Sequence, residues 1–381
     1  MSPRIYLDYC ATTPVHASVR EKMLQALEVD FGNPSSMHWA GTDSVQLMTR
    51  ARADVAEGIG CRPDEVIFTS GATEADNLAL FGTMHLFTPD KAHLITSAIE
   101  HHAILHAAEK LEREGYSVTY LPVDEYGLVN PEDVQRAVRP ETKLISIMYV
   151  NNEVGSVQPI AEIGTIARER GIRFHTDAVQ AMGSFDVNLD DLHVDLLSLS
   201  AHKIYGPKGV GALYVRPGLE LIPMLVGGSQ ENSFRAGTEN VPGIVGLGAA
   251  MALVRQYRAS ERARLANLRK YLIDGLKSAG LSVIVHGLEG RTAAHILSIS
   301  FTGADAEMLL IRLNGEGIAV SLGSACNSRS IEPSHVLTAM QLPQEQIEST
   351  LRISLGMPVT KDELDTFLGA VARVLPRVMI Q

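Results

Sequence analysis

The alternation of short apolar runs with helical patterns between residues 65 and 215 constrains the fold more than any other feature of this sequence. The apolar runs are EVIFTS (65–70), AHLITSA (92–98), KLISIMYV (143–150), IRFHTDA (172–178), VDLLSLSA (194–201) and GVGALYV (209–215). Strands of this length that alternate with helices are typical of βαβ units, which build a mostly parallel sheet covered by helices. We therefore predict an α/β fold for this region.

A second, smaller domain is predicted after this region. Residues 243–280 carry a long helical pattern in which charged residues separate the apolar ones. A strand at 295–301, a helix at 304–314 and a closing helix from about 360 follow. We place the large domain at residues 15–256 and the small domain at residues 1–14 together with 257–381.

Charge and cysteine content exclude several classes of protein. The formal net charge of −11, with no basic run, argues against direct binding of nucleic acid. No apolar run reaches the roughly 20 residues that span a bilayer, and the N-terminal residues show no targeting pattern, so we expect a cytoplasmic protein that does not bind membranes. The cysteines, Cys10, Cys61 and Cys326, have no C-x-x-C spacing, which indicates neither a disulfide framework nor a structural zinc site.

The residues that follow the predicted strands carry the candidate chemistry, because ligands of open α/β sheets bind at the carboxyl ends of the strands. Gly71, Ala72 and Thr73 lead from a strand into a helical pattern. The backbone N–H groups at such a helix start, together with the Thr73 hydroxyl, can bind a phosphate. The alternative is an ordinary helix N-cap.

Two further strand ends carry a carboxylate and an amine. Asp177 lies among apolar neighbours and needs a partner, so it is either a helix N-cap or a carboxylate that keeps a ring nitrogen protonated. Lys203 ends a buried strand, where desolvation favours the neutral, nucleophilic amine; the alternative is a lysine whose charged end reaches water. One βαβ step separates the two residues, and the pair is more specific than either alone.

Three histidines follow another predicted strand. His102 and His106 are four residues apart and can share a helix face, as in some zinc sites. No glutamate lies between them and no third ligand is evident, so we expect no metal site. His101 is better placed to contact a ligand at the strand end.

A nucleophilic amine, an acidic partner for a protonated ring and a phosphate site are the parts that pyridoxal phosphate (PLP) requires. Specific motifs extend this pattern from residue 5 to at least residue 356, and they include YLDYCATTP, FTSGATEADNLAL, NNEVGSVQPI, HTDAVQ, SAHKIYGPKGVGALYVR, RAGTENVPGIVG, SLGSACNSRSIEPSHVL and LRISLG. With these motifs the chain resembles the NifS/IscS-type cysteine desulfurases. The resemblance implies the aspartate-aminotransferase-like fold type I, with a mostly parallel seven-stranded sheet in the large domain and an α+β small domain.

The resemblance also implies roles for individual residues. One group contacts the cofactor ring or bonds to it: Lys203, Asp177, Gln180, Asn152 and His101. A second group binds the phosphate of the cofactor: Ala72, Thr73, Ser200, His202 and, from the other subunit of a homodimer, Thr238. Asn152 and Arg352 hold the carboxylate of the substrate, L-cysteine.

Cys326 lies in SLGSACNSRS (321–330), where small and polar residues show no periodicity. A cysteine in such a loop is either incidental or displayed for chemistry. The resemblance implies that Cys326, with Lys203 and His101, is catalytic: its thiolate attacks the sulfur of the bound cysteine, which leaves alanine and a persulfide on Cys326. It also allows Cys326 to serve as a transient iron–sulfur ligand.

We therefore expect an active cysteine desulfurase that passes sulfur to an acceptor protein, such as an iron–sulfur scaffold or a tRNA thiolation enzyme. One alternative is a selenocysteine lyase of the same fold, which depends less on a thiol because selenium leaves more readily; Cys326 argues against it. The other alternative is an inactive scaffold, and the presence of Lys203, Asp177 and Arg352 argues against that.

Overall fold

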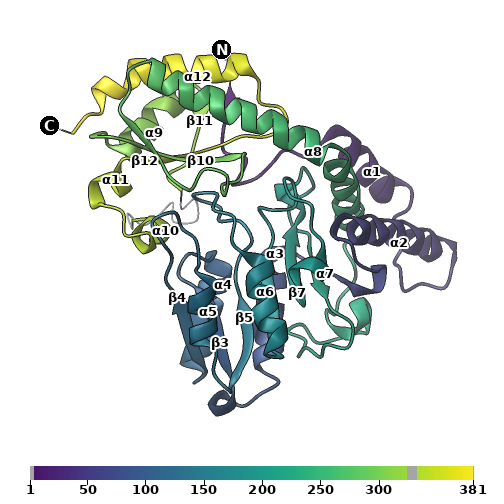
Figure 1. The fold of residues 1–381 in the computed structure, drawn as a ribbon. Helices are drawn as coiled ribbons and strands as arrows, with labels where there is room; N and C mark the ends of the chain where they lie inside the picture. Colours follow the sequence, from purple (N-terminus) through teal and green to yellow (C-terminus); the bar gives the residue numbers. More distant parts are fainter. Residues whose placement is uncertain (1–3, 324–332, 381) are drawn as a thin grey trace.

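A seven-stranded sheet forms the centre of the large domain (Figure 1) in the computed structural model, which describes residues 4–323 and 333–380. Its strand order is β2-β8-β7-β6-β5-β3-β4. The strands are β2 (Val66–Thr69), β3 (His93–Ser97), β4 (Ser117–Leu121), β5 (Thr142–Ser146), β6 (Arg173–Asp177), β7 (Leu196–Ser200) and β8 (Gly211–Val215). Only β8 runs antiparallel to its neighbours β2 and β7. The predicted mostly parallel sheet is confirmed.

The predicted strand that ends at residue 150 is wrong in its length, because β5 ends at Ser146. Beyond that point, the backbone N–H of Met148 donates to the Glu100 carboxyl group at 3.0 Å instead of continuing the ladder with β3. Strand β4 was not among the predicted strands, and its burial is only partial because it lies at the edge of the sheet.

Helices with an apolar face cover the sheet. In α4 the buried residues Ile104, Ala107, Ala108 and Leu111 recur at the three- and four-residue spacing of one helix face. The helices of this part are α1 (Ala17–Glu28), α2 (Trp39–Ile59), α3 (Ala72–Met84), α4 (His102–Arg113), α5 (Pro131–Ala137), α6 (Ile160–Glu169) and α7 (Leu189–Leu192). Among the helices of the described residues, none is both long enough and apolar enough to cross a membrane.

The small domain is built on a three-stranded antiparallel sheet of order β12-β10-β9. Strand β1, near the N-terminus, pairs in parallel with β11 in the same part of the molecule. The strands are β1 (Ile5–Tyr6), β9 (Val283–Val285), β10 (Ile296–Phe301), β11 (Ile318–Ala319) and β12 (Thr350–Ser354). The helices of this part of the sequence are α9 (Ala306–Gly315), α10 (His335–Ala339), α11 (Gln344–Glu348) and α12 (Lys361–Val374), of which α10 packs Val336 and Leu337 into the core of the seven-stranded sheet.

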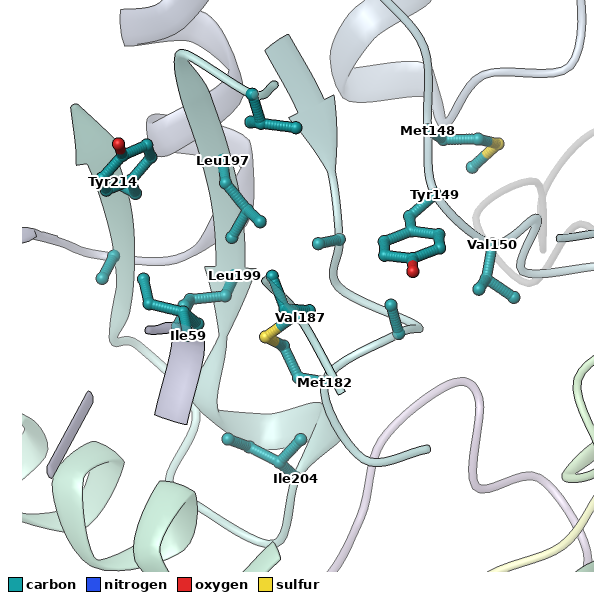
Figure 2. Packing of buried hydrophobic residues seen from close by; sticks show 14 of the residues in the cluster. Ile59, Met148, Tyr149, Val150, Met182, Val187, Leu197, Leu199, Ile204 and Tyr214 are labelled. Atoms are coloured by element: carbon teal, nitrogen blue, oxygen red, sulfur yellow. The ribbon is translucent and has the colours of Figure 1, made fainter. Parts of the chain in front are cut away.

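Helix α8 (Val241–Ser278) joins two hydrophobic cores (Figure 1). Leu247 and Met251 in its first half pack into the core of the seven-stranded sheet, whereas Leu272 and Leu276 pack into the core of the small domain. Figure 2 shows the first core around β7, where Leu197 and Leu199 lie with Met182 and Ile204. This packing fixes the end of β7, from which the functional residues continue.

Candidate active site

A cavity of about 660 Å³ lies at the carboxyl ends of β3, β6 and β7. Its volume is in the range of small-molecule binding sites. The structure brings together in its lining the following residues that the sequence singled out: Ala72, Thr73, His101, Asn152, Asp177, Gln180, Ser200, His202, Lys203 and Arg352.

Two of the predicted site residues are not part of this lining. Thr238 is exposed elsewhere on this chain, in the segment that precedes α8. Cys326 lies outside the described residues, as does the rest of segment 324–332.

Lys203 ends a single 3₁₀ turn (Ala201–Lys203) that directly follows β7. Its Nζ donates hydrogen bonds to the backbone oxygens of Cys10 and, at 2.9 Å, of Ala11. The backbone N–H of Thr13 donates to the His202 oxygen at 2.8 Å. We call residues 8–13 the N-terminal segment. The segment thus forms one wall of the site, beside the lysine.

Asp177 is the last residue of β6, and it is buried. Burial raises the pKa of Asp177 to about 6, although the hydrogen bond from the Val179 N–H, 2.9 Å from Oδ1, and the charge of Lys203 both favour the carboxylate. No helix begins after Asp177, so its side chain caps a turn and the helix N-cap alternative is excluded. The side chain of Gln180 donates to the Cys10 oxygen at 3.1 Å.

His101 is the N-cap of α4, a role that the sequence analysis did not predict. Its Nδ1 accepts a hydrogen bond from the Ala103 N–H at 3.1 Å, so the proton of the neutral ring is assigned to Nε2. Burial, followed by the charge of Lys203, lowers the pKa of His101 to about 4. The imidazole is therefore neutral at physiological pH.

The rings of His102 and His106 stack with centroids 5.0 Å apart, as expected for a shared helix face. The ring of His335 lies 4.8 Å from that of His102. No group of three or more potential ligands that could hold a metal ion occurs within residues 4–323 and 333–380.

The start of α3 forms another part of the cavity wall. The helix begins at Ala72, with Gly71 as its N-cap, so first-turn N–H groups that have no partner within the helix lie at the cavity wall. This start lies close against β8, because a Cβ atom on Gly211 would be 2.7 Å from the carbonyl carbon of Gly71.

Burial lowers the pKa of His202 to about 4, and its Nδ1 lies 3.1 Å from the Thr12 hydroxyl.

Arg352 comes from the middle of β12 and is 2% exposed. Its Nη1 donates to the backbone oxygens of Asn152 at 3.0 Å and Gly323 at 2.9 Å, and its Nη2 donates to Asp8 Oδ1 at 2.8 Å. Nε is buried and has no hydrogen-bond acceptor among the described residues. The guanidinium group therefore retains donors for a ligand in the cavity.

Two buried acids at the site were missed by the sequence analysis. Asp76 of α3 lines the cavity, and burial together with the charge of Asp177 raises its pKa well above the usual range. Burial also raises the pKa of Glu100 to about 8, although its carboxyl group accepts from the Ser97 hydroxyl at 2.6 Å and from Met148. The sequence held a signal for Glu100, which follows the apolar end of β3 closely, but none for Asp76, which lies inside α3.

Comparison with known proteins gives matches over nearly the whole chain. The cysteine desulfurase IscS of Dictyoglomus turgidum is 46% identical, covering 99% of this chain and 96% of the relative. The cysteine desulfurase IscS of Methanosarcina thermophila is 47% identical, covering 98% of this chain and 92% of the relative. A solved NifS-like protein superposes with a TM-score of 0.93 at 36% identity, covering 99% of this chain and all of the other. The solved complex of SspA with cysteine gives a TM-score of 0.80 at 39% identity, over 92% and 98% of the two chains.

The sheet topology, with a cavity at the strand ends, defines an α/β transferase of fold type I. The pattern of the family Aminotransferase class-V matches residues 5–367. The chain therefore belongs to the class-V aminotransferase family and, within it, to the cysteine desulfurases of the NifS/IscS type. The resemblance seen in the sequence is confirmed.

Proposed function

We propose that this chain removes sulfur from L-cysteine with the help of PLP, releases L-alanine and carries the sulfur as a persulfide on Cys326. The observation that carries the proposal is the convergence in one cavity of the Lys203 amine, the Asp177 carboxyl group, the start of α3 and the Arg352 guanidinium. Membership of the cysteine desulfurase family supports the same reaction.

The residues present fit PLP in both size and chemistry. The cavity offers an amine for a covalent bond at Lys203, a buried acid for a ring nitrogen at Asp177 and a helix start for a phosphate at Ala72. The remaining contacts of the proposed site are Thr73, Ser200 and His202 for the phosphate, Gln180 for the ring hydroxyl, and His101 and Asn152 beside the ring. When bound, PLP supplies an electron sink for bonds that break in the substrate.

The residues of the large domain hold and move protons in this proposal. Asp177 is ionised when a cationic ring nitrogen lies against it, and it keeps the proton on that nitrogen. The neutral ring of His101 offers Nε2–H as a donor at the cavity, since its Nδ1 already accepts from Ala103. The Nζ of Lys203 would take the proton from the substrate Cα.

The other residues bind and cleave the substrate. Arg352 binds the α-carboxylate with its remaining N–H groups, with Asn152 beside it. The Cys326 thiolate attacks the substrate sulfur, so that an S–S bond forms while the C–S bond breaks. The electron pair of the broken bond stays with the substrate carbon, which gains a proton and becomes the methyl group of alanine.

We further propose a homodimer in which Thr238 completes the phosphate site of the other subunit. Large exposed apolar side chains support a partner copy, among them Phe31 (69% exposed), Trp39 (71%) and Val226 (84%). We keep the division of the chain into residues 15–256 and residues 1–14 with 257–381 as a proposal. The separate core around Leu272 and Leu276 supports it, whereas Val336, Leu337 and Met340 pack into the core of the seven-stranded sheet. We place the protein in the cytoplasm, with an iron–sulfur scaffold or a tRNA thiolation enzyme as sulfur acceptor and with Cys326 as a transient cluster ligand.

The test compares the wild-type protein with Cys326→Ser, and with Cys61→Ser as a matched control. The PLP-loaded wild type should release alanine from L-cysteine and carry one additional sulfur atom on Cys326. In Cys326→Ser we expect sulfur transfer to fall about 100-fold or more, because a hydroxyl is far less acidic than a thiol and is a poor nucleophile. Cys326→Ser should keep the visible absorbance of bound PLP.

Burial raises the pKa of Cys61 to about 12, so Cys61→Ser should retain the wild-type rate. A wild-type rate of alanine release in Cys326→Ser contradicts the proposal. Mass spectrometry that locates the persulfide on Cys10 or Cys61 contradicts it equally.

A further inference from the structure

Arg352 is unusual among the cavity residues because an ion pair occupies part of its guanidinium group. Asp8 Oδ1 accepts from Nη2 at 2.8 Å, and the Arg352 and Asp8 side chains are 2% and 17% exposed. A charge-assisted hydrogen bond of this length, shielded from water, holds a guanidinium group in one orientation. Asp8 was not singled out in the sequence.

The pattern of donors shows what remains for a ligand. An arginine has five N–H donors in a planar fork. Nη1 donates to Asn152 and Gly323, and Nη2 donates to Asp8, whereas Nε has no acceptor among the described residues. The backbone oxygens and the Asp8 carboxylate thus leave two donors, Nε–H and the second N–H of Nη2, which are enough for one carboxylate.

The charges around Arg352 also favour the binding of only one substrate carboxylate. Glu153, the other acid beside Arg352, lines the cavity and accepts a hydrogen bond from the Ser334 hydroxyl. The other lysine or arginine side chains in the described lining are Lys203, which the proposed cofactor occupies, and Lys208, which is exposed. A second carboxylate on the substrate would therefore meet the negative charges of Glu153 and, beside Arg352, of Asp8, without a buried cation of its own among the described lining residues.

We propose that Asp8 is a positioning and specificity residue, which holds Arg352 so that its two remaining N–H groups bind one α-carboxylate, and which repels amino acids that carry a second carboxylate. The inference rests on the proposed function, because it assumes that Arg352 binds the substrate carboxylate. It assigns to the N-terminal segment a part in substrate selection, in addition to its contacts with Lys203.

The test uses the PLP-loaded protein and two acids of four carbons, butyrate with one carboxylate and succinate with two. Calorimetry gives their dissociation constants without turnover. Asp8→Asn keeps an oxygen acceptor but removes the charge, so we expect the affinity ratio of succinate to butyrate to rise about 10-fold. Asp90→Asn removes a charge at an exposed site and should leave the ratio unchanged.

A second variant tests positioning. Asp8→Ala removes the acceptor, so the KM for L-cysteine should rise about 10-fold while kcat stays within about 2-fold of the wild type. An unchanged affinity ratio in Asp8→Asn overturns the inference, as does a loss of kcat without a change of KM in Asp8→Ala. If the wild type released no alanine from cysteine, the proposed function would fail, whereas the calorimetric ratio would still decide whether Asp8 selects for one carboxylate.

Discussion

The two sides of the cavity are built in different ways. On the side of the large domain, Asp177 and Lys203 follow directly from the ends of β6 and β7, and neighbouring strands bring them to one edge of the sheet. On the side of the small domain, Arg352 lies in the middle of β12 and is held by Asp8 and Gly323, which are remote in sequence. The positions of the large-domain residues therefore follow from the order of the strands. The position of Arg352 on the small-domain side depends instead on tertiary contacts, which no local sequence pattern indicates.

The largest expected effect tests the large-domain side. Lys203→Ala removes the amine at the end of β7, so the protein should lose the visible absorbance of covalently bound PLP and at least about 1,000-fold of its activity. Absorbance spectra and alanine release measure the two losses. Lys277→Ala, an exposed lysine of α8, is the control. Retained absorbance together with sulfide release in Lys203→Ala would falsify the assignment.

A smaller effect should separate the two sides. Arg352→Lys keeps the charge but loses the planar fork, so kcat/KM for L-cysteine should fall about 100-fold, or about 2.7 kcal/mol. Cofactor absorbance should be unchanged, because the large-domain residues are intact. If Arg352→Lys loses PLP as completely as Lys203→Ala does, the two sides of the cavity do not have separate roles in binding cofactor and substrate.

The smallest effect concerns stability rather than activity. Burial raises the pKa of Glu100 to about 8 from 4.5, so the folded protein holds a proton that the unfolded chain releases between these values. The free energy of unfolding should therefore decrease as pH rises from 4.5 to 8, by up to about 1.4 kcal/mol per pH unit from this group. Denaturation of Glu100→Gln at several pH values should show a shallower decrease. Parallel pH dependences in the two proteins would exclude a proton on Glu100.

The sequence predicted much of the large-domain side for a physical reason. Five-residue strands that are buried along their length, such as β3 and β7, read as apolar runs whatever their neighbours are. Polar residues at their ends then stand out, and Asp177 and Lys203 were recognised in this way. The strand predicted at residues 143–150 was too long, because apolar residues beyond Ser146 stay buried without extending the ladder with β3.

The residues that the sequence did not reveal depend on pairing at long range. From the sequence alone, an acid such as Asp8 is expected at the protein surface. Only its contact with Arg352, 344 residues away, gives it a role. The role of Arg352 itself was inferred from the resemblance alone. Asp76 lies inside a helix, where an acid is ordinary, and only the fold shows that burial and Asp177 surround it. Such features need the tertiary structure.

The contacts of the N-terminal segment also determine when, during synthesis of the chain, this segment can fold. Ribosomes deliver the N-terminus first, yet β1 pairs with β11, and the Cys10 N–H donates to the Ser354 hydroxyl at 2.9 Å. Residues 5–10 must therefore wait until Ile318 and Ser354 have been synthesised before they can take their native place. The wall beside Lys203 therefore takes its final place only after Ser354 has been synthesised, so a nascent chain that stops before this residue cannot offer a finished cofactor site.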